Sequence, residues 1–160
     1  AAAEAGAPLP VRYASLCGAL EKSPGGMKAP VAGLWRAPRE CVELAALRAA
    51  LTAGERQALA GAAVLDALAW MVLLERCDAL RRPDRFGALQ QVCGLIAGLG
   101  RDFEKAFRPA QSALRAALGV TVNSLASRAD FTQDNGQIDG EKLGQMLRQA
   151  RIEAIAQNVL

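Results

Sequence analysis

The sequence predicts an all-α fold, and its composition is the first reason. Of its 160 residues 52% are hydrophobic but only 4% are aromatic, so a core must be built from Ala, Leu and Val. Such residues favour close helix packing over a sheet, which draws on β-branched and aromatic side chains. Apolar residues also recur at helical spacing along most of the chain. The length suits one domain, or two small helical modules that share a core.

The first half of the chain is expected to hold three helical stretches. Apolar spacing predicts a helix over residues 11–21, and Pro38 occupies a favourable first position for the next one. A capping box then starts the stretch 52–80, because its N-cap threonine is followed three residues later by Glu55. A break is expected near Gly61.

The second half predicts three longer helices and a short one. Gly119 is expected to end the middle helix as a left-handed C′ residue, before a short helix over 120–129. The first of the longer helices is expected over residues 83–96 and begins at Pro83. The second is expected over 103–118, where Pro109 is tolerated, and the third over 140–158, where the pattern is amphipathic.

Positive charge is concentrated in the second half. The formal net charge is +3, from 19 basic and 16 acidic residues, which by itself is too small to imply nucleic-acid binding. Residues 1–75 hold seven basic and seven acidic side chains, whereas residues 76–160 hold twelve and nine. The whole excess therefore lies after residue 75.

Several function classes are excluded or disfavoured by what the sequence lacks. There is no histidine, so neither a Ser-His-Asp nor a Cys-His site is possible. The four cysteines form no CxxC pair and are interpreted as free thiols of a cytoplasmic protein, with a two-disulfide secreted protein as the alternative. They are Cys17, Cys41, Cys77 and Cys93. We expect no metal and no cofactor.

Neither a membrane span nor a signal peptide is expected. No apolar run reaches the ~18 residues that a bilayer requires, and we find no signal peptide. The chain begins at Ala1 rather than at a methionine, which predicts a fragment or a processed product.

The segment Asp134–Asp139 superficially resembles a calcium-binding EF-hand loop. With Gly136 at position six of such a loop, positions one and twelve would be Phe131 and Lys142. Calcium needs oxygen ligands at both positions, so a turn built on the Asn-Gly pair is the better interpretation.

Two groups of residues are candidates for binding phosphate. Gly140 and Gly144 open the last helix, where free N–H groups attract anions, and Arg148 and Arg151 would extend that face; packing, turn geometry and solvated charge are the alternatives. Arg81, Arg82 and Arg85 form the second group. Asp78 and Asp84 lie close enough in sequence to pair with them, so this group is either a ligand site or a structural junction.

Four blocks of sequence, in order, resemble the bacterial CCA-adding tRNA nucleotidyltransferases. VRYASLCGALEK at 11–22 is similar to the family's V-R-[FY]-A-x-L-x-H-D-L-x-K, and RAPRECVELAAL at 36–47 to its R-V-P-x-x-C-x-E-L-A-x-L. LLERCDALRRPDRF at 73–86 resembles L-x-x-x-D-A-x-R-[KR]-P-x-R-F. The run 114–118 and then GEKLGQMLRQARIEAI at 140–155 resemble the family's tail. The blocks cover nearly the whole chain.

The resemblance implies a degenerate HD-domain-like helical bundle followed by a helical tail. Residues 1–80 would be the HD-like region and residues 81–160 the tail, packed as one unit. Gly18 and Ala19 occupy the positions of the family's His and Asp metal ligands, and Ala50, Leu51 and Thr52 the positions of its Glu-Glu-His. Because HD phosphohydrolases need those ligands to hold the metal that activates water, we expect that activity to be lost.

The resemblance also implies a role. In the family the nucleotidyltransferase head precedes this region and these helices hold the elbow of tRNA, so we expect a non-catalytic region that binds tRNA or another structured RNA, from a parent that is itself a nucleotidyltransferase. Lys142, Arg148 and Arg151 would contact phosphates, with the N–H groups near Gly140 and Gly144.

Two other hypotheses stay open. One is a protein-interaction or scaffolding domain that lost RNA binding, which Asp139, Leu95 and Ile96 favour because they replace charged residues of the family pattern. The other is an enzyme with a new active site, for which the sequence suggests no constellation of residues.

Overall fold

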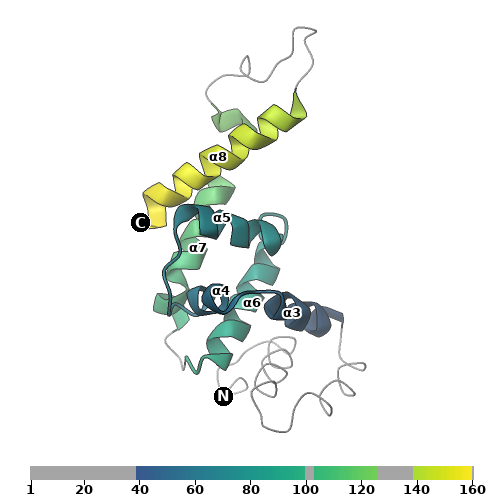
Figure 1. Ribbon diagram of the computed structural model, residues 1–160, viewed down its shortest axis with the longest axis vertical. Helices are drawn as coiled ribbons and strands as arrows, with labels where there is room; N and C mark the ends of the chain where they lie inside the picture. The colour runs from purple at the N-terminus through teal and green to yellow at the C-terminus, as the bar shows by residue number, and fades with distance from the viewer. Residues whose placement is uncertain (1–38, 100–102, 126–138, 160) are drawn as a thin grey trace.

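The computed structural model describes residues 39–99, 103–125 and 139–159, which form α-helices and no strand (Figure 1). The all-α prediction is therefore confirmed. None of the described helices is both long and apolar enough to cross a membrane. The elements are α3 (Arg39–Ala49), α4 (Ala53–Leu59), α5 (Ala67–Arg76), α6 (Pro83–Ile96), α7 (Phe103–Gly119), the 3-10 helix η1 (Val122–Ser124) and α8 (Gly140–Val159).

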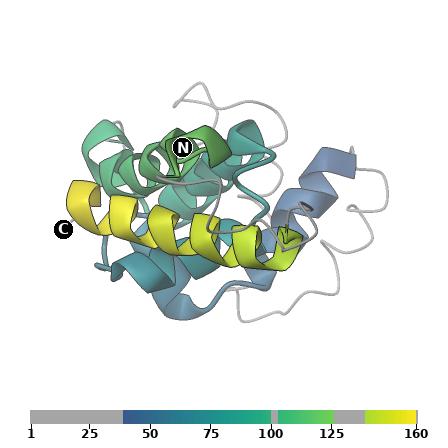
Figure 2. The same cartoon turned by 90° about the horizontal axis from the view of Figure 1, so that it is seen from above.

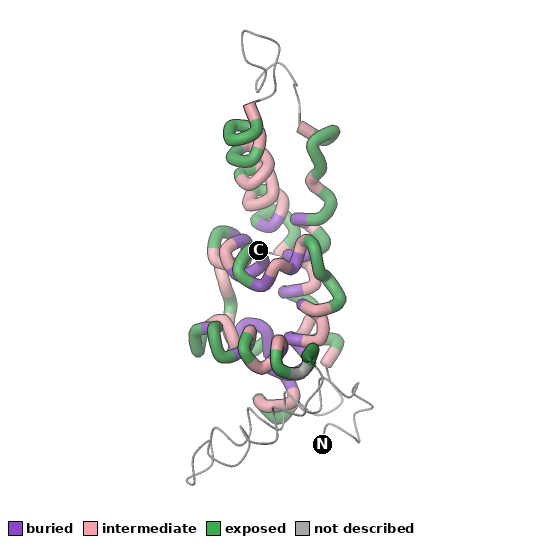
Figure 3. Tube along the Cα trace, turned by 90° about the vertical axis from the view of Figure 1, so that its right-hand side faces the viewer, coloured by how far each residue is buried: buried purple, intermediate pink, exposed green. Residues whose placement is uncertain are grey.

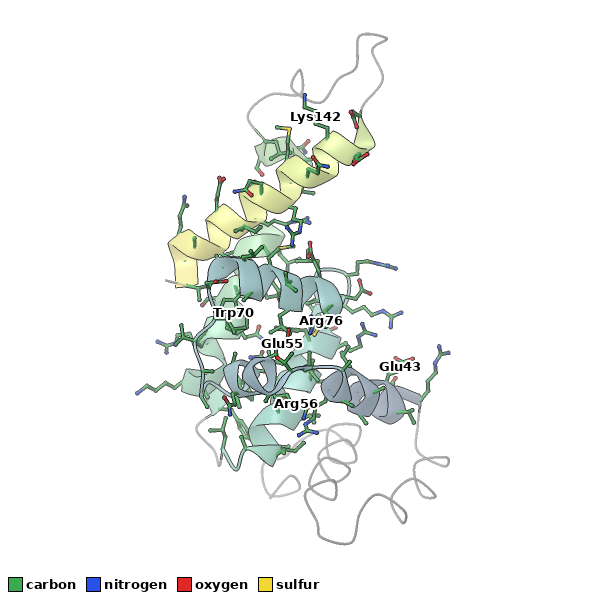
Figure 4. The ribbon with its side chains drawn as sticks, in the orientation of Figure 1. Glu43, Glu55, Arg56, Trp70, Arg76 and Lys142 are labelled. Atoms are coloured by element: carbon green, nitrogen blue, oxygen red, sulfur yellow. The ribbon has the colours of Figure 1, made fainter. Side chains whose placement is uncertain are left out.

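The predicted capping box starts α4 and also ties α4 to its neighbours. The backbone N–H of Glu55 donates to Oγ1 of Thr52 at 3.2 Å, and the N–H of Thr52 donates to Oε2 of Glu55 at 2.8 Å. Arg76, in the last turn of α5, donates from Nη1 to both oxygens of Glu55 at 2.8 Å. Arg56 donates to two carbonyl oxygens at the end of α3, each at 3.1 Å (Figure 4). Side chains of α4 and α5 thus fix the ends of three helices.

The break expected near Gly61 is present and has a steric cause. Gly61 has φ 73°, a left-handed conformation that L side chains rarely adopt. A Cβ at this position would lie 2.6 Å from the carbonyl oxygen of Ala106 on α7. Asp66 then caps α5, because its Oδ1 accepts from the N–H of Ala69 at 2.7 Å.

Two predicted helix ends differ from the structure. The stretch expected to reach residue 80 stops at Arg76, because Asp78 has φ 52° and reverses the chain. No glycine marks that reversal, so the sequence pattern did not indicate it. Gly119 is the last residue of α7 and not a left-handed C′ residue; the chain leaves the helix through extended backbone at Thr121. A short helix was expected over 120–129; the described part of this range, up to residue 125, contains the 3-10 helix η1.

A core formed by all six α-helices holds the described part together (Figure 3). Its largest fully buried side chains include Trp70, Phe86, Leu59, Met71, Leu89 and Ile155. Gln90 of α6 is also fully buried; its Nε2 donates to the carbonyl oxygen of Phe107 at 3.4 Å, and its Oε1 accepts from Gln111. The core therefore includes a polar link between α6 and α7.

Helix α8 lies across α5 and α7, and its first half extends past α5 (Figures 1 and 2). Ile155, in the second half, is its one fully buried residue. The first half therefore presents most of its surface to solvent, and the predicted phosphate-binding residues begin there.

Candidate nucleic-acid interface

The N-terminus of α8, where phosphate was expected to bind, already holds a carboxylate. Oδ1 of Asp139 accepts hydrogen bonds from the backbone N–H groups of Glu141 at 3.1 Å and Lys142 at 3.0 Å. These are two of the four N–H groups that a helix start leaves without a partner. A phosphate that uses them must displace Asp139.

Gly140 and Gly144 are both exposed, and packing inside the protein does not explain them. A Cβ built on either residue would meet no atom within 4 Å. The packing alternative raised for these glycines therefore finds no support among the described residues. The two positions remain open to close approach by a ligand.

The three cations predicted on α8 do not share one face. Because successive residues of an α-helix are rotated by about 100°, Lys142 lies about 120° from Arg148 and about 180° from Arg151 around the axis. Lys142 is exposed, on the half of α8 that extends beyond the body (Figure 4). Arg151 is one turn from the buried Ile155, and its Nε is buried without a hydrogen-bond partner. Arg151 thus faces the other helices and Lys142 faces away.

Arg148 is paired with Glu75 of α5, 73 residues away in sequence. Its Nε donates to Oε1 at 2.7 Å and its second terminal nitrogen donates to Oε2 at 3.2 Å. This hydrogen bond, and then the negative charge of Glu75, raise the pKa of the Arg148 guanidinium above its ordinary value. The pair links α8 to α5, and a phosphate would have to compete with Glu75 for Arg148.

The junction cluster consists of Arg81, Arg82 and Arg85 around Asp78, between α5 and α6. The Asp78 carboxylate lies 3.9 Å from Nε of Arg81, 4.0 Å from Nε of Arg82 and 4.0 Å from Nη2 of Arg85. Nη2 of Arg85 also donates to the carbonyl oxygen of Cys77 at 2.9 Å. Arg85 is thus largely structural, whereas the side chains of Arg81 and Arg82 are 81% and 54% exposed.

Two of the positions where the resemblance places lost metal ligands have structural roles here. Leu51 is 3% exposed in the core, and Thr52 caps α4. Ala50 is exposed, and Gly18 and Ala19 lie outside the described residues. Within the described ranges, no three His, Cys, Asp or Glu side chains are grouped so as to hold a metal ion.

Two of the cysteines are buried free thiols, as predicted for them. Burial, above all other causes, raises the pKa of Cys77 to about 12 and that of Cys93 to about 11. Both thiols therefore stay protonated at neutral pH and are poor nucleophiles and metal ligands. The predictions for Cys17 and for the Cys41 side chain fall outside what the structure describes.

Sequence reasoning missed three cations on the outer face of α7. Lys105, Arg108 and Arg115 are all exposed, and in the described part of the chain none of them forms an ion pair or a side-chain hydrogen bond. We call them the α7 stripe. Their spacing of three and seven residues was a readable signal, since it places side chains on one side of a helix.

Curated relatives match nearly the whole chain. A "Multifunctional CCA protein" of Leptothrix cholodnii is 34% identical over 171 residues, which cover 97% of this chain and 40% of the relative. A "Multifunctional CCA protein" of Polaromonas naphthalenivorans is 32% identical, with 98% and 40% covered. A "CCA-adding enzyme" of Bordetella pertussis is 34% identical, with 96% and 36% covered.

The chain thus spans about two fifths of the length of these relatives, in their C-terminal part. No family model matches the chain. No solved structure matches it either.

Proposed function

This chain belongs to the family of the CCA-adding enzymes and is homologous over nearly all of its length to their C-terminal part. We propose that it is a non-catalytic helical region that binds tRNA through the phosphate backbone of the RNA. The observation that carries the proposal is the set of exposed cations in the second half, on α8 and in the connection between α5 and α6. Lys142, Arg81 and Arg82 are its exposed members among the predicted site residues. With that role we propose a cytoplasmic location.

The predicted site residues divide into two roles in this proposal. Lys142, Arg81 and Arg82 are exposed and contact phosphates directly, with Gly140 and Gly144 allowing the backbone to come close. Arg148 joins them by exchanging Glu75 for a phosphate, since both are oxyanions that accept from a guanidinium. Arg85 and Arg151 position the helices that carry the contacts.

The same proposal assigns no catalysis to this chain by itself. Leu51 in the core and Thr52 at the start of α4 replace, by the resemblance, residues that would hold a metal ion. The nucleotidyltransferase activity of the parent would belong to a head outside this region. The chain would supply affinity for tRNA and its orientation, and not the chemical step.

The protein-interaction alternative gains no support from the described residues. An exposed apolar surface around Leu95 and Ile96 would have supported that alternative, but both side chains are partly buried against the core.

Salt dependence of tRNA binding tests the proposal. We expect the purified chain to bind a tRNA transcript at 50 mM salt, and the affinity to fall steeply by 200 mM, because each neutralised phosphate contributes about −0.7 to −0.9 to the slope of log K against log salt. Lys142→Gln should weaken binding and lower the slope by about 1. Its neighbour Glu141, also exposed, provides the control, since Glu141→Gln should not weaken binding. A chain with no affinity for tRNA at 50 mM salt would refute the proposal.

A further inference from the structure

We propose that the α7 stripe, formed by Lys105, Arg108 and Arg115, is a second surface that contacts the phosphates of the bound RNA; the inference rests on the proposed function. The three side chains fall within an arc of about 80° around α7 and along about 15 Å of its axis. Such a row of positive charge is complementary to a phosphodiester backbone, whose negative charges follow one another along a line.

The three cations of the α7 stripe have no carboxylate partner within the described ranges, whereas several other arginines do. Arg39 pairs with Glu43, Arg76 with Glu55, and Arg148 with Glu75. Glu104 is the one acidic residue of α7, and it forms no ion pair with Arg108 although the two are four residues apart. The stripe therefore keeps its charge available to a ligand.

The stability of α7 does not account for these cations. The helix is held by its other side, where Ala110, Ala113, Leu114 and Ala117 are buried. Lys105 lies in the first turn, where the positive end of the helix dipole makes a cation unfavourable. Helix stability therefore gives no reason for a cation in that position.

The surface between the three cations of the α7 stripe allows an RNA strand to lie along it. Ser112 lies within the same arc, between Arg108 and Arg115 along the axis, and its hydroxyl is a further donor for a phosphate oxygen. Residues 105, 108, 115 and 119 of this arc are exposed, and Ser112 is partly exposed.

Binding of a tRNA transcript by the full chain, measured between 50 and 200 mM salt, tests this inference. The triple variant Lys105→Gln, Arg108→Gln, Arg115→Gln should weaken binding roughly ten- to a hundredfold and lower the salt slope by about 2 to 3, since up to three phosphate contacts are lost. The matched control Lys105→Arg, Arg108→Lys, Arg115→Lys keeps all three charges and should bind nearly as well as wild type.

The outcomes separate this inference from the function on which it rests. If the wild-type chain binds tRNA and the triple variant has the same affinity and slope, the α7 stripe is not a contact surface, whereas the proposed function stands. If the wild-type chain does not bind, both fail. Should the triple variant not fold, Lys105→Gln and Arg115→Gln alone decide the matter, since each should lower the slope by about 1.

Discussion

The junction cluster and the α7 stripe each carry three basic side chains, yet their surroundings differ. At the junction, Asp78 lies within 4.0 Å of all three arginines, and Arg85 also binds the carbonyl oxygen of Cys77. On α7 the three cations have no such partner in the part of the chain that the structure describes. The comparison teaches that a nearby carboxylate limits what a basic side chain offers to a ligand: Arg85 serves the fold, Arg81 and Arg82 are exposed but share their charge with Asp78, and the cations of α7 have no such competitor.

The largest expected effect is on stability. Arg85→Ala should lower the free energy of unfolding by about 1–2 kcal/mol, because it removes the hydrogen bond to the Cys77 carbonyl and a packed side-chain stem. Arg108→Ala, on the α7 stripe, should change it by less than about 0.5 kcal/mol. Urea denaturation followed by circular dichroism measures both. If both variants lost the same free energy of unfolding, Arg85 would support the fold no more than Arg108 does.

The next effect concerns the carboxylate at the junction. Asp78→Asn should raise tRNA affinity by up to about tenfold, because it frees Arg81 and Arg82 and removes a charge that repels phosphate. Asparagine tolerates the left-handed backbone at this position, so the fold should be kept. Glu40→Gln makes the same charge change at an exposed position of α3 and serves as the control. An affinity that stays at the wild-type value would mean that the junction arginines do not reach the RNA.

The smallest effect compares two glycines in corresponding helix positions. Gly144 of α8 and Gly87 of α6 are each the fifth residue of their helix, and a Cβ on either meets nothing within 4 Å. Alanine at each should raise the free energy of unfolding by roughly 0.5–1 kcal/mol. Of the two variants, only Gly144→Ala should also weaken tRNA binding, because the added methyl group obstructs the approach of the RNA backbone to α8. If both variants bind tRNA equally well, Gly144 does not belong to the interface.

Much of the fold was readable because its signals are local. The capping box of Thr52 and Glu55 and the start of α6 at Pro83 each depend on residues within one turn of one another. The break at Gly61 was marked by the glycine itself, whereas its close contact with Ala106 of α7 required the structure. The end of α5 was missed because the left-handed residue is Asp78 and not a glycine.

The candidate site was harder to predict because its side chains pair with residues that are far away in the sequence. Arg148 and Glu75 are 73 residues apart, so no pattern within α8 could indicate that this arginine is already bound. Asp139 could have been recognised as an N-cap residue, and it explains why the N–H groups of α8 are occupied. The spacing of the α7 stripe was visible in the sequence, but the outward direction of that face required the structure.

The salt slope lost per neutralised cation tests the comparison most directly. The slope of log K against log salt for tRNA binding would be measured for wild type, for the neutral α7 triple variant and for Arg81→Gln, Arg82→Gln. We expect each cation of the α7 stripe to contribute about 0.7 to 0.9 to the slope, and each junction arginine, screened by Asp78, to contribute clearly less. A junction variant that loses as much slope per cation as the α7 variant, or more, would contradict the account.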